Sequence, residues 1–253
     1  MKTTLRIAHC SDIHLDSNAP GHSGNDALRH AFAAALADMR AHHPDIMLLA
    51  GDLFDSNRPT EDTVRWAMHV LGEQPFPVAM IPGNHDCMET GAIFARFDFN
   101  TVPNVRMLSA TEGEVAFLPE LDVAVWGKGM VEHNRAYRPL DGCPERPAGV
   151  RWYLGMGHGL FVPHGGDTDR SSPIHMREIE ASPCDYLGLG HHHAAMELVT
   201  DHSAAAYSGS CTDNIGRGHS YVIADLGQAN VARVGIHVVG TEHTAQIRAH
   251  AAD

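Results

Sequence analysis

The 253-residue chain has few cysteines and no long apolar run. Its five cysteines are irregularly spaced and form no CxxC pair, which argues against a disulfide framework and a thiolate zinc site. No stretch approaches the ~20 apolar residues that span a bilayer, and the mixed N-terminus lacks the apolar core of a secretory signal. We therefore expect a soluble, cytoplasmic protein.

Positive charge is also scarce. The formal net charge is −13, and Lys2 and Lys128 are the only lysines. The sequence thus lacks the basic clusters of a surface that binds nucleic acid non-specifically. This disfavours a nucleic-acid partner without excluding one, because bound metal ions would offset part of the negative charge. No membrane partner is expected, and the sequence leaves open whether the chain forms a homo-oligomer.

The first hundred residues alternate between strand-like runs and amphipathic helices. The strand-like runs are residues 5–10, 45–50 and 77–81. Between them, apolar residues recur every three or four positions, which predicts helices over 26–42 and 60–72, with Thr60 as the N-cap of the second. Three strand–loop–helix units in a row predict a parallel sheet with crossover helices.

After about residue 100 the pattern changes to short strands with little helix between them. These strands are predicted at 105–108, 115–118, 123–126, 152–156, 186–189 and within 220–239. Because no linker-like stretch separates two cores, we expect one domain over residues 1–253, with no separate capping domain. The predicted fold class is α/β, a two-sheet β-sandwich flanked by helices, in which the second half of the chain forms the second sheet. Residues 133–149 and 163–173 lack periodicity and are predicted to be loops that shape a substrate pocket.

Five short segments offer metal-type ligands beside a glycine or at the end of an apolar run. They are Asp12-Ile13-His14, Gly51-Asp52, Gly83-Asn84-His85-Asp86, Gly157-His158 and Gly190-His191-His192-His193. Each follows a strand-like run, and open α/β sheets bind ligands beyond the carboxyl ends of their strands. We therefore expect the segments to converge. Two aspartates, an asparagine and several histidines suit two divalent cations of intermediate hardness.

Spacing within the segments suggests how the ligands would be shared. In extended backbone, side chains i and i+2 project to the same side, so Asp12 and His14 are expected to reach one ion. By the same reasoning His191 and His193 would serve two ions about 3.5–4 Å apart, with His192 on the opposite side.

Two further ligands fit the same scheme. Asp52 has two carboxylate oxygens that can bridge the ions, and Asn84 is a neutral oxygen donor. Each segment alone has an ordinary interpretation, such as a turn at GNHD. Their joint presence, in order and after strands, favours a metal site.

Together the segments resemble the DxH, GDxxD, GNHD, GH and GHxH pattern of the calcineurin-like metallophosphoesterase superfamily. The resemblance extends over residues 12–193 and implies the four-layer α/β/β/α fold of that superfamily. The sequences CSDIHLD, LLAGDLFDSNRP and YLGLGHHH are most similar to the SbcD-type DNA-repair nuclease branch.

The resemblance also implies residue roles. Two ligand sets would share one carboxylate: Asp12, His14, Asp52 and His193 for one ion, and Asp52, Asn84, His158 and His191 for the other. His85 would be the catalytic histidine and Asp86 the carboxylate that orients it, while Asp55 would support its own loop.

A hydroxide that bridges two cations is a nucleophile near neutral pH, and the ions neutralise phosphoryl charge. We therefore expect a dinuclear metal-dependent phosphoesterase that hydrolyses phosphodiesters, with nuclease-like activity on DNA or small diesters. Alternatives are a phosphomonoesterase on the same centre and a non-catalytic scaffold, the latter disfavoured because every expected ligand is present. Manganese is the expected metal, with iron, zinc, cobalt and nickel as alternatives.

Two arginines are candidates for substrate binding. Arg58 and Arg217 each follow an asparagine- or glycine-bearing loop, from which a guanidinium can hold a phosphate oxygen. Ordinary solvated arginines are the alternative. The Tyr207-Ser208-Gly209-Ser210 turn also resembles a loop near the site in the nuclease branch.

Overall fold

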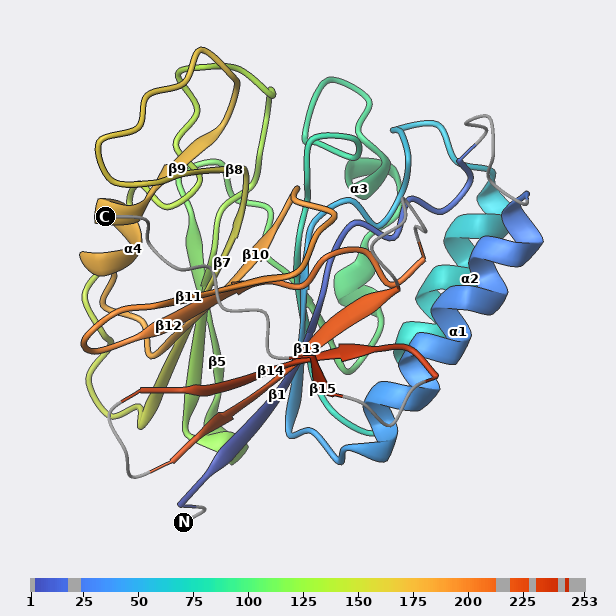
Figure 1. The fold of residues 1–253 in the computed structure, drawn as a ribbon. Helices are drawn as coiled ribbons and strands as arrows, with labels where there is room; N and C mark the ends of the chain where they lie inside the picture. Colours follow the sequence, from blue (N-terminus) through green and yellow to red (C-terminus); the bar gives the residue numbers. More distant parts are fainter. Residues whose placement is uncertain (1–2, 18–23, 213–218, 228–230, 241–243, 246–253) are drawn as a thin grey trace.

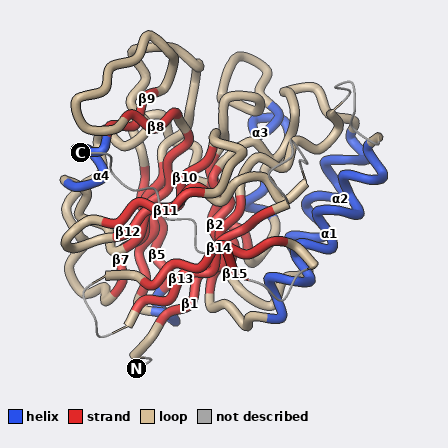
Figure 2. Tube along the Cα trace, viewed as in Figure 1, coloured by secondary structure: helices blue, strands red, loops and turns tan. Residues whose placement is uncertain are grey.

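A computed structural model describes residues 3–17, 24–212, 219–227, 231–240 and 244–245. Two β-sheets stack in the middle of the molecule, and helices cover their outer faces (Figure 1). Figure 2 shows the strands gathered centrally, with α1 (Asn25–Ala41) and α2 (Glu61–Gly72) along one side. The predicted α/β sandwich is confirmed.

The first sheet has the strand order β15-β14-β13-β1-β2-β3-β4. Strands β1 to β4 are parallel, while β13 pairs antiparallel with β1. The bounds are β1 (Leu5–Cys10), β2 (Ile46–Ala50), β3 (Val78–Ile81), β4 (Val105–Met107), β13 (Ser220–Leu226), β14 (Arg233–Val238) and β15 (Thr244–Ala245).

The second sheet has the order β11-β12-β10-β7-β6-β5. Its inner strands β6, β7, β10 and β12 are parallel, and both edge strands are antiparallel to their neighbours. The bounds are β5 (Glu114–Leu118), β6 (Val123–Gly127), β7 (Trp152–His158), β10 (Tyr186–Gly190), β11 (Met196–Val199) and β12 (Ala204–Tyr207).

The remaining elements are short. Strands β8 (Leu160–Val162) and β9 (Pro173–His175) form a small parallel pair. Helices α3 (Ile93–Arg96) and α4 (Met176–Glu180) and the 3₁₀ turns η1 (Phe99–Thr101) and η2 (Pro119–Leu121) complete the described structure. None of the described helices has the length and apolar character needed to cross a membrane. The cytoplasmic location stays a prediction.

The central strands are apolar on both faces because each face packs against a different layer. In the first sheet, Ile7 and Leu48 point between the sheets, where they join residues of the second sheet in one buried cluster. Their neighbours Ala8 and Leu49 point outward into a cluster with α1 and α2. The outer face of the second sheet packs against Ile179 of α4. This gives the order helix, sheet, sheet, helix.

The two long helices follow the sequence pattern. The buried face of α1 consists of the apolar residues that recur at helical spacing. Helix α2 has Thr60 as its N-cap, and the Thr60 hydroxyl accepts from the N–H of Thr63 at 3.3 Å. This cap satisfies one of the free N–H groups at the helix start. Both helices connect parallel strands of the first sheet, as predicted.

The assignment of every late strand to the second sheet was wrong. Strand β4 pairs with β3, and β13 and β14 extend the first sheet beside β1. Apolar patterns show that a strand is buried but not which strand it pairs with, since pairing depends on distant contacts. The chain therefore crosses between the sheets twice, after β4 and after β12.

Candidate metal centre

The five ligand segments lie at the carboxyl ends of parallel strands (the upper side in Figure 1). Three follow β1, β2 and β3 of the first sheet; the other two lie at the end of β7 and directly after β10 in the second. Stacking of the sheets brings these ends together. The predicted convergence is therefore observed, and its two halves come from different sheets.

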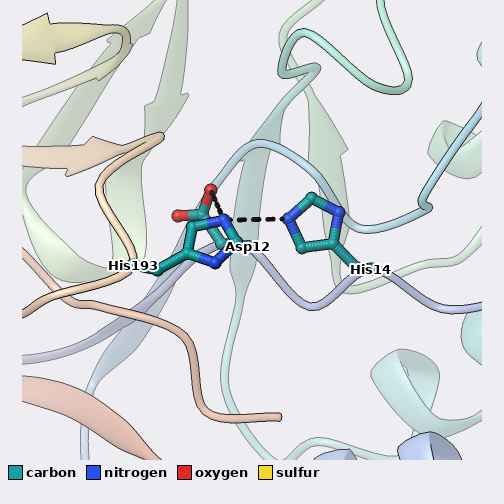
Figure 3. A group of neighbouring side chains, drawn as sticks. All are labelled: Asp12, His14 and His193. Carbon is teal, nitrogen blue, oxygen red and sulfur yellow. Dashed lines mark hydrogen bonds and ion pairs between the residues drawn. The ribbon is translucent and has the colours of Figure 1, made fainter. Parts of the chain in front are cut away.

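The first ligand group contains Asp12, His14 and His193, whose ligand atoms all lie within 4.8 Å of one another. The two histidine Nε2 atoms are 3.2 Å apart, and His193 Nε2 is 3.6 Å from Asp12 Oδ1. Figure 3 shows the imidazoles approaching from opposite sides with the Asp12 carboxylate beside them. Their ring nitrogens and the carboxylate face one place, as ligands of a cation would.

A second group forms around the side-chain oxygen of Asn84. Asn84 Oδ1 lies 2.8 Å from His191 Nδ1 and 3.0 Å from His158 Nε2. His158 is buried, and its Nδ1 lies 2.8 Å from the carbonyl oxygen of Ala50. Because a carbonyl only accepts, Nδ1 carries the hydrogen and Nε2 is left as the ligand atom in the neutral ring.

The carboxylate of Asp52 lies between the two groups. Its Oδ2 is 3.3 Å from His158 Nε2 and 3.8 Å from His14 Nε2, while Oδ1 accepts from the backbone N–H of His85 at 2.9 Å. The site thus offers carboxylate, amide and imidazole donors in two groups that share one carboxylate. This donor set fits two divalent cations of intermediate hardness.

The backbone at the ligands differs from the extended geometry that we expected. Asp12, His14 and Asp52 have φ values of 56°, 52° and 54°, and His191 has 93°. The same-side argument for residues two apart was therefore wrong. Residues 12–14 form a turn that is bound to the loop after β2. The Gly51 carbonyl accepts from the N–H of Asp12 at 3.1 Å, and the Asp52 carbonyl accepts from the N–H of His14 at 3.1 Å. These hydrogen bonds bring the ligands together.

Glycines adjoin the ligands because the backbone approaches them too closely for a side chain. A Cβ on Gly83 would overlap the Asp52 carboxylate, and one on Gly190 would overlap the carbonyl of Ala50 and the ring of His158. Gly83 and Gly190 are therefore packing requirements of the centre.

The aspartates of the site raise the pKa of two of its histidines. Burial lowers the pKa of His14, but the ion pair with Asp55 and the charges of Asp52 and Asp12 outweigh it and raise the pKa to about 9. Burial likewise opposes charging of His158, yet Asp52 raises its pKa to about 9. Both histidines keep the pKa of Asp52 below its usual range despite burial. A cation would replace these protons.

His85 lies at the edge of the centre, with its side chain 42% exposed. Its ring packs edge-on against that of His14, with centroids 4.7 Å apart. Its Nδ1 lies 2.9 Å from the carbonyl oxygen of Asp55 and 3.8 Å from the Asp55 carboxylate. Asp55 also lies 3.2 Å from His14 Nδ1, so it positions both imidazoles.

Asp86 has a different place from the one expected. Its carboxylate is fully buried and accepts from the N–H of Gly83 at 2.7 Å and the N–H of Phe54 at 3.1 Å. Burial and the nearby charge of Asp52 raise its pKa to about 6. The residue beside the His85 ring is therefore Asp55 and not the expected Asp86. Asp86 instead connects the two loops that carry Asp52 and Asn84.

The sequence pattern of the calcineurin-like phosphoesterase family matches residues 5–195. The chain belongs to this family. This family uses a dinuclear metal centre. The uncharacterized metallophosphoesterase YhaO of Bacillus subtilis (strain 168) is 29% identical over 235 residues, which are 83% of this chain and 54% of the relative. The chain thus spans about half the length of this curated relative.

Solved structures show the same fold. TT1561 of Thermus thermophilus superposes with a TM-score of 0.60 at 15% identity, covering 92% of this chain and 99% of its own. A dimetal phosphatase from Danio rerio gives a TM-score of 0.59 at 11% identity, covering 96% and 97%. The narrower resemblance to the SbcD-type branch stays a prediction.

The two candidate arginines of this phosphoesterase are not brought to the centre by any described contact. Arg58 is exposed on the loop after Asp52, and its described hydrogen bond is from its backbone N–H to Ser56 Oγ at 3.2 Å. Arg217 lies outside the described residues. Substrate binding by either arginine stays a prediction.

One histidine near the centre was missed. The ring of His133 lies 5.2 Å from that of His191, and its Nδ1 is 3.0 Å from Ser172 Oγ. The N–H of Ser172 donates to the carbonyl of Asn134 at 2.9 Å, so the loops predicted at 133–149 and 163–173 are joined beside the centre. In the sequence, His133 is only a histidine at the start of a loop without periodicity, and such a residue does not by itself indicate a place near the metal centre.

Proposed function

We propose that this phosphoesterase hydrolyses phosphodiesters with two divalent ions, one held by Asp12, His14, Asp52 and His193 and the other by Asp52, Asn84, His158 and His191. The position of Asp52 Oδ2, 3.3 Å and 3.8 Å from histidines of the two groups, is the observation that carries the proposal. When bound, the ions supply Lewis-acid activation of water and of the phosphoryl group. Manganese is the proposed metal.

In this proposal His85 donates a proton to the leaving oxygen. The Asp55 carbonyl accepts from Nδ1, so the other ring nitrogen, Nε2, donates only when the imidazole is charged. The 42% exposed side chain allows a substrate to approach it. A positioned acid of this kind contributes about 10²–10⁴-fold to rate.

The sequences of the DxH, GDxxD and GHxH segments are most similar to a nuclease branch of the family, which favours a diester as the bond cleaved. The net charge of −13 disfavours a long polyanion, because association with nucleic acid depends on neutralising phosphates with basic residues. We therefore propose short single strands or small diesters as substrates of the nuclease-like activity.

A substrate panel tests the proposal. Metal-free protein is loaded with Mn²⁺ and given bis-p-nitrophenyl phosphate, p-nitrophenyl phosphate, a cyclic nucleotide and single-stranded DNA; the panel is repeated with iron, zinc, cobalt and nickel. We expect hydrolysis of the diesters to exceed that of the monoester. Faster monoester hydrolysis would instead identify a phosphomonoesterase. No hydrolysis with any metal would identify a scaffold and contradict the proposal.

A further inference from the structure

The second crossing between the sheets passes directly beside the metal centre. After β12 the chain leaves the second sheet, and residues 208–212 run past the end of β1 before β13 enters the first sheet (Figure 1). Ser11 and Ser210 form an isolated parallel bridge there. This crossing segment lies outside the residues matched by the family pattern, which end at 195.

Two hydroxyls of the crossing segment bind the backbone of the Asp12 turn. Ser210 Oγ donates to the carbonyl of Asp12 at 2.6 Å, and Thr212 Oγ1 donates to the carbonyl of Ile13 at 2.6 Å. Both hydroxyl side chains are buried. On the other side of the turn, the N–H of Ile13 donates to the carbonyl of Asp52 at 2.8 Å. The turn is therefore clamped between two distant segments.

A third hydroxyl sets the direction of the Asp12 carboxylate. Ser11 Oγ donates to Asp12 Oδ2 and lies 2.8 Å from Ser208 Oγ. The N–H of His191 approaches both carboxylate oxygens, at 3.1 and 3.0 Å. With Oδ2 engaged by Ser11, Oδ1 is the oxygen that faces His193 at 3.6 Å.

These contacts explain how a non-glycine residue keeps a left-handed conformation in the middle of the centre. Asp12 and His14 have φ values of 56° and 52°, which side chains with a Cβ rarely adopt unless the surroundings impose them. The carbonyls of Asp12 and Ile13 are buried and need donors, and these donors come from the crossing segment. Without them the turn loses the hydrogen bonds that favour the ligand-presenting conformation over others.

We propose that Ser11, Ser210 and Thr212 are positioning residues that set the affinity of the Asp12–His14 side of the centre for its metal ion. Hydrogen-bonding partners of metal ligands typically contribute about 10–100-fold to metal affinity. The inference rests on the proposed metal centre but is independent of which phosphate ester is hydrolysed.

Calorimetric titration of metal-free protein with Mn²⁺ alone tests the inference. In Thr212→Val, which keeps the shape and removes the donor, and in Ser210→Ala, we expect one of the two Mn²⁺ sites to weaken about 10–100-fold. Thr212→Ser, which keeps the donor, is expected to bind as the wild type does. The matched control is Ser203→Ala, a buried hydroxyl that contacts Thr200 in the turn between β11 and β12.

Thermal melting of each metal-free variant separates positioning from simple stabilisation. A lower melting temperature with unchanged Mn²⁺ affinity in Thr212→Val and Ser11→Ala would overturn the inference, and it would do so even where Ser210→Ala fails to fold. Equal losses in Thr212→Ser and Thr212→Val would overturn it as well. If the wild type binds two Mn²⁺ ions yet hydrolyses no ester, the proposed function fails while this inference is still decided by the titration.

Discussion

The Nε2 atoms of His14 and His193 lie 3.2 Å apart, although the residues are 179 positions apart in the chain. Two neutral imidazoles at this distance need a hydrogen between them, and His14 Nδ1 also lies 3.2 Å from Asp55. A charged His14 satisfies both neighbours, in accord with its pKa of about 9. A cation bound by His14 and His193 would take the place of this proton.

Metal binding should therefore release protons. His14 and His158 have folded-state pKa values of about 9, above the ordinary 6.5. Divalent cations need neutral imidazole, so Mn²⁺ affinity is expected to rise with pH and to level off above about 9. Calorimetry at pH 7 in buffers of different ionisation enthalpy measures the release. A binding enthalpy that does not vary with the buffer would contradict it.

The same shift affects the metal-free fold. Because the folded-state pKa of both histidines is raised, their charged forms contribute stability that is complete below pH about 6.5 and is lost as the pH rises through about 9. We expect metal-free protein to melt at a lower temperature at pH 9.5 than at pH 6.5. Saturation with Mn²⁺ should remove this contribution of the two histidines, because the bound cations replace their protons.

Asp52→Asn should reduce metal occupancy below two ions per chain. The substitution keeps the shape of the side chain but removes the negative charge that faces His14 and His158. Elemental analysis after dialysis measures the loss, with the exposed Asp201→Asn as the matched control. Two ions per chain in Asp52→Asn would contradict the bridging position.

Gly83→Ala should weaken the centre although no ligand is substituted. The added Cβ would overlap the carboxylate of Asp52, and overpacking of this kind costs about 1–3 kcal/mol of folding free energy. We expect weaker Mn²⁺ binding and a lower melting temperature. Gly227→Ala is the control, because its Cβ would meet nothing within 4 Å; equal behaviour of the two variants would refute the close-packing explanation.

His85→Ala should lower kcat by about 10²–10⁴-fold while both metal ions stay bound. The side chain is proposed to handle the leaving-group proton, and its described contacts are with Asp55 and His14. His69→Ala on α2, an exposed histidine paired with Glu73, controls for loss of an imidazole. An unchanged rate in His85→Ala would exclude the proposed role.

The sequence predicted the ligand-bearing strand ends because that information is local. Strands β1, β2 and β3 are short apolar runs that end just before Ser11, Gly51 and Pro82. Periodicity and turn residues reveal such boundaries. Parallel strands run in the same direction, so their carboxyl ends all lie at the same end of the sheet. The position of the candidate site followed from that alone.

The conformation at the ligands was not predictable from local pattern. The left-handed φ of Asp12 is stabilised by Gly51 on one side and Ser210 on the other, residues that nothing adjacent to Asp12 indicates. The role of Asp86 was misread for a similar reason. The family resemblance implied a contact with His85, but the buried N–H groups of Gly83 and Phe54 donate to this carboxylate instead.

All proposed ligands lie at the carboxyl ends of the strands, so the opposite end of the two sheets carries none of them. The connections there, such as residues 73–77 between α2 and β3, lie at the amino ends of the strands. A fluorescent label or a short insertion at this end should leave metal binding intact. The fold therefore offers an attachment point for immobilising or tagging the enzyme at the far end of the strands from its catalytic groups.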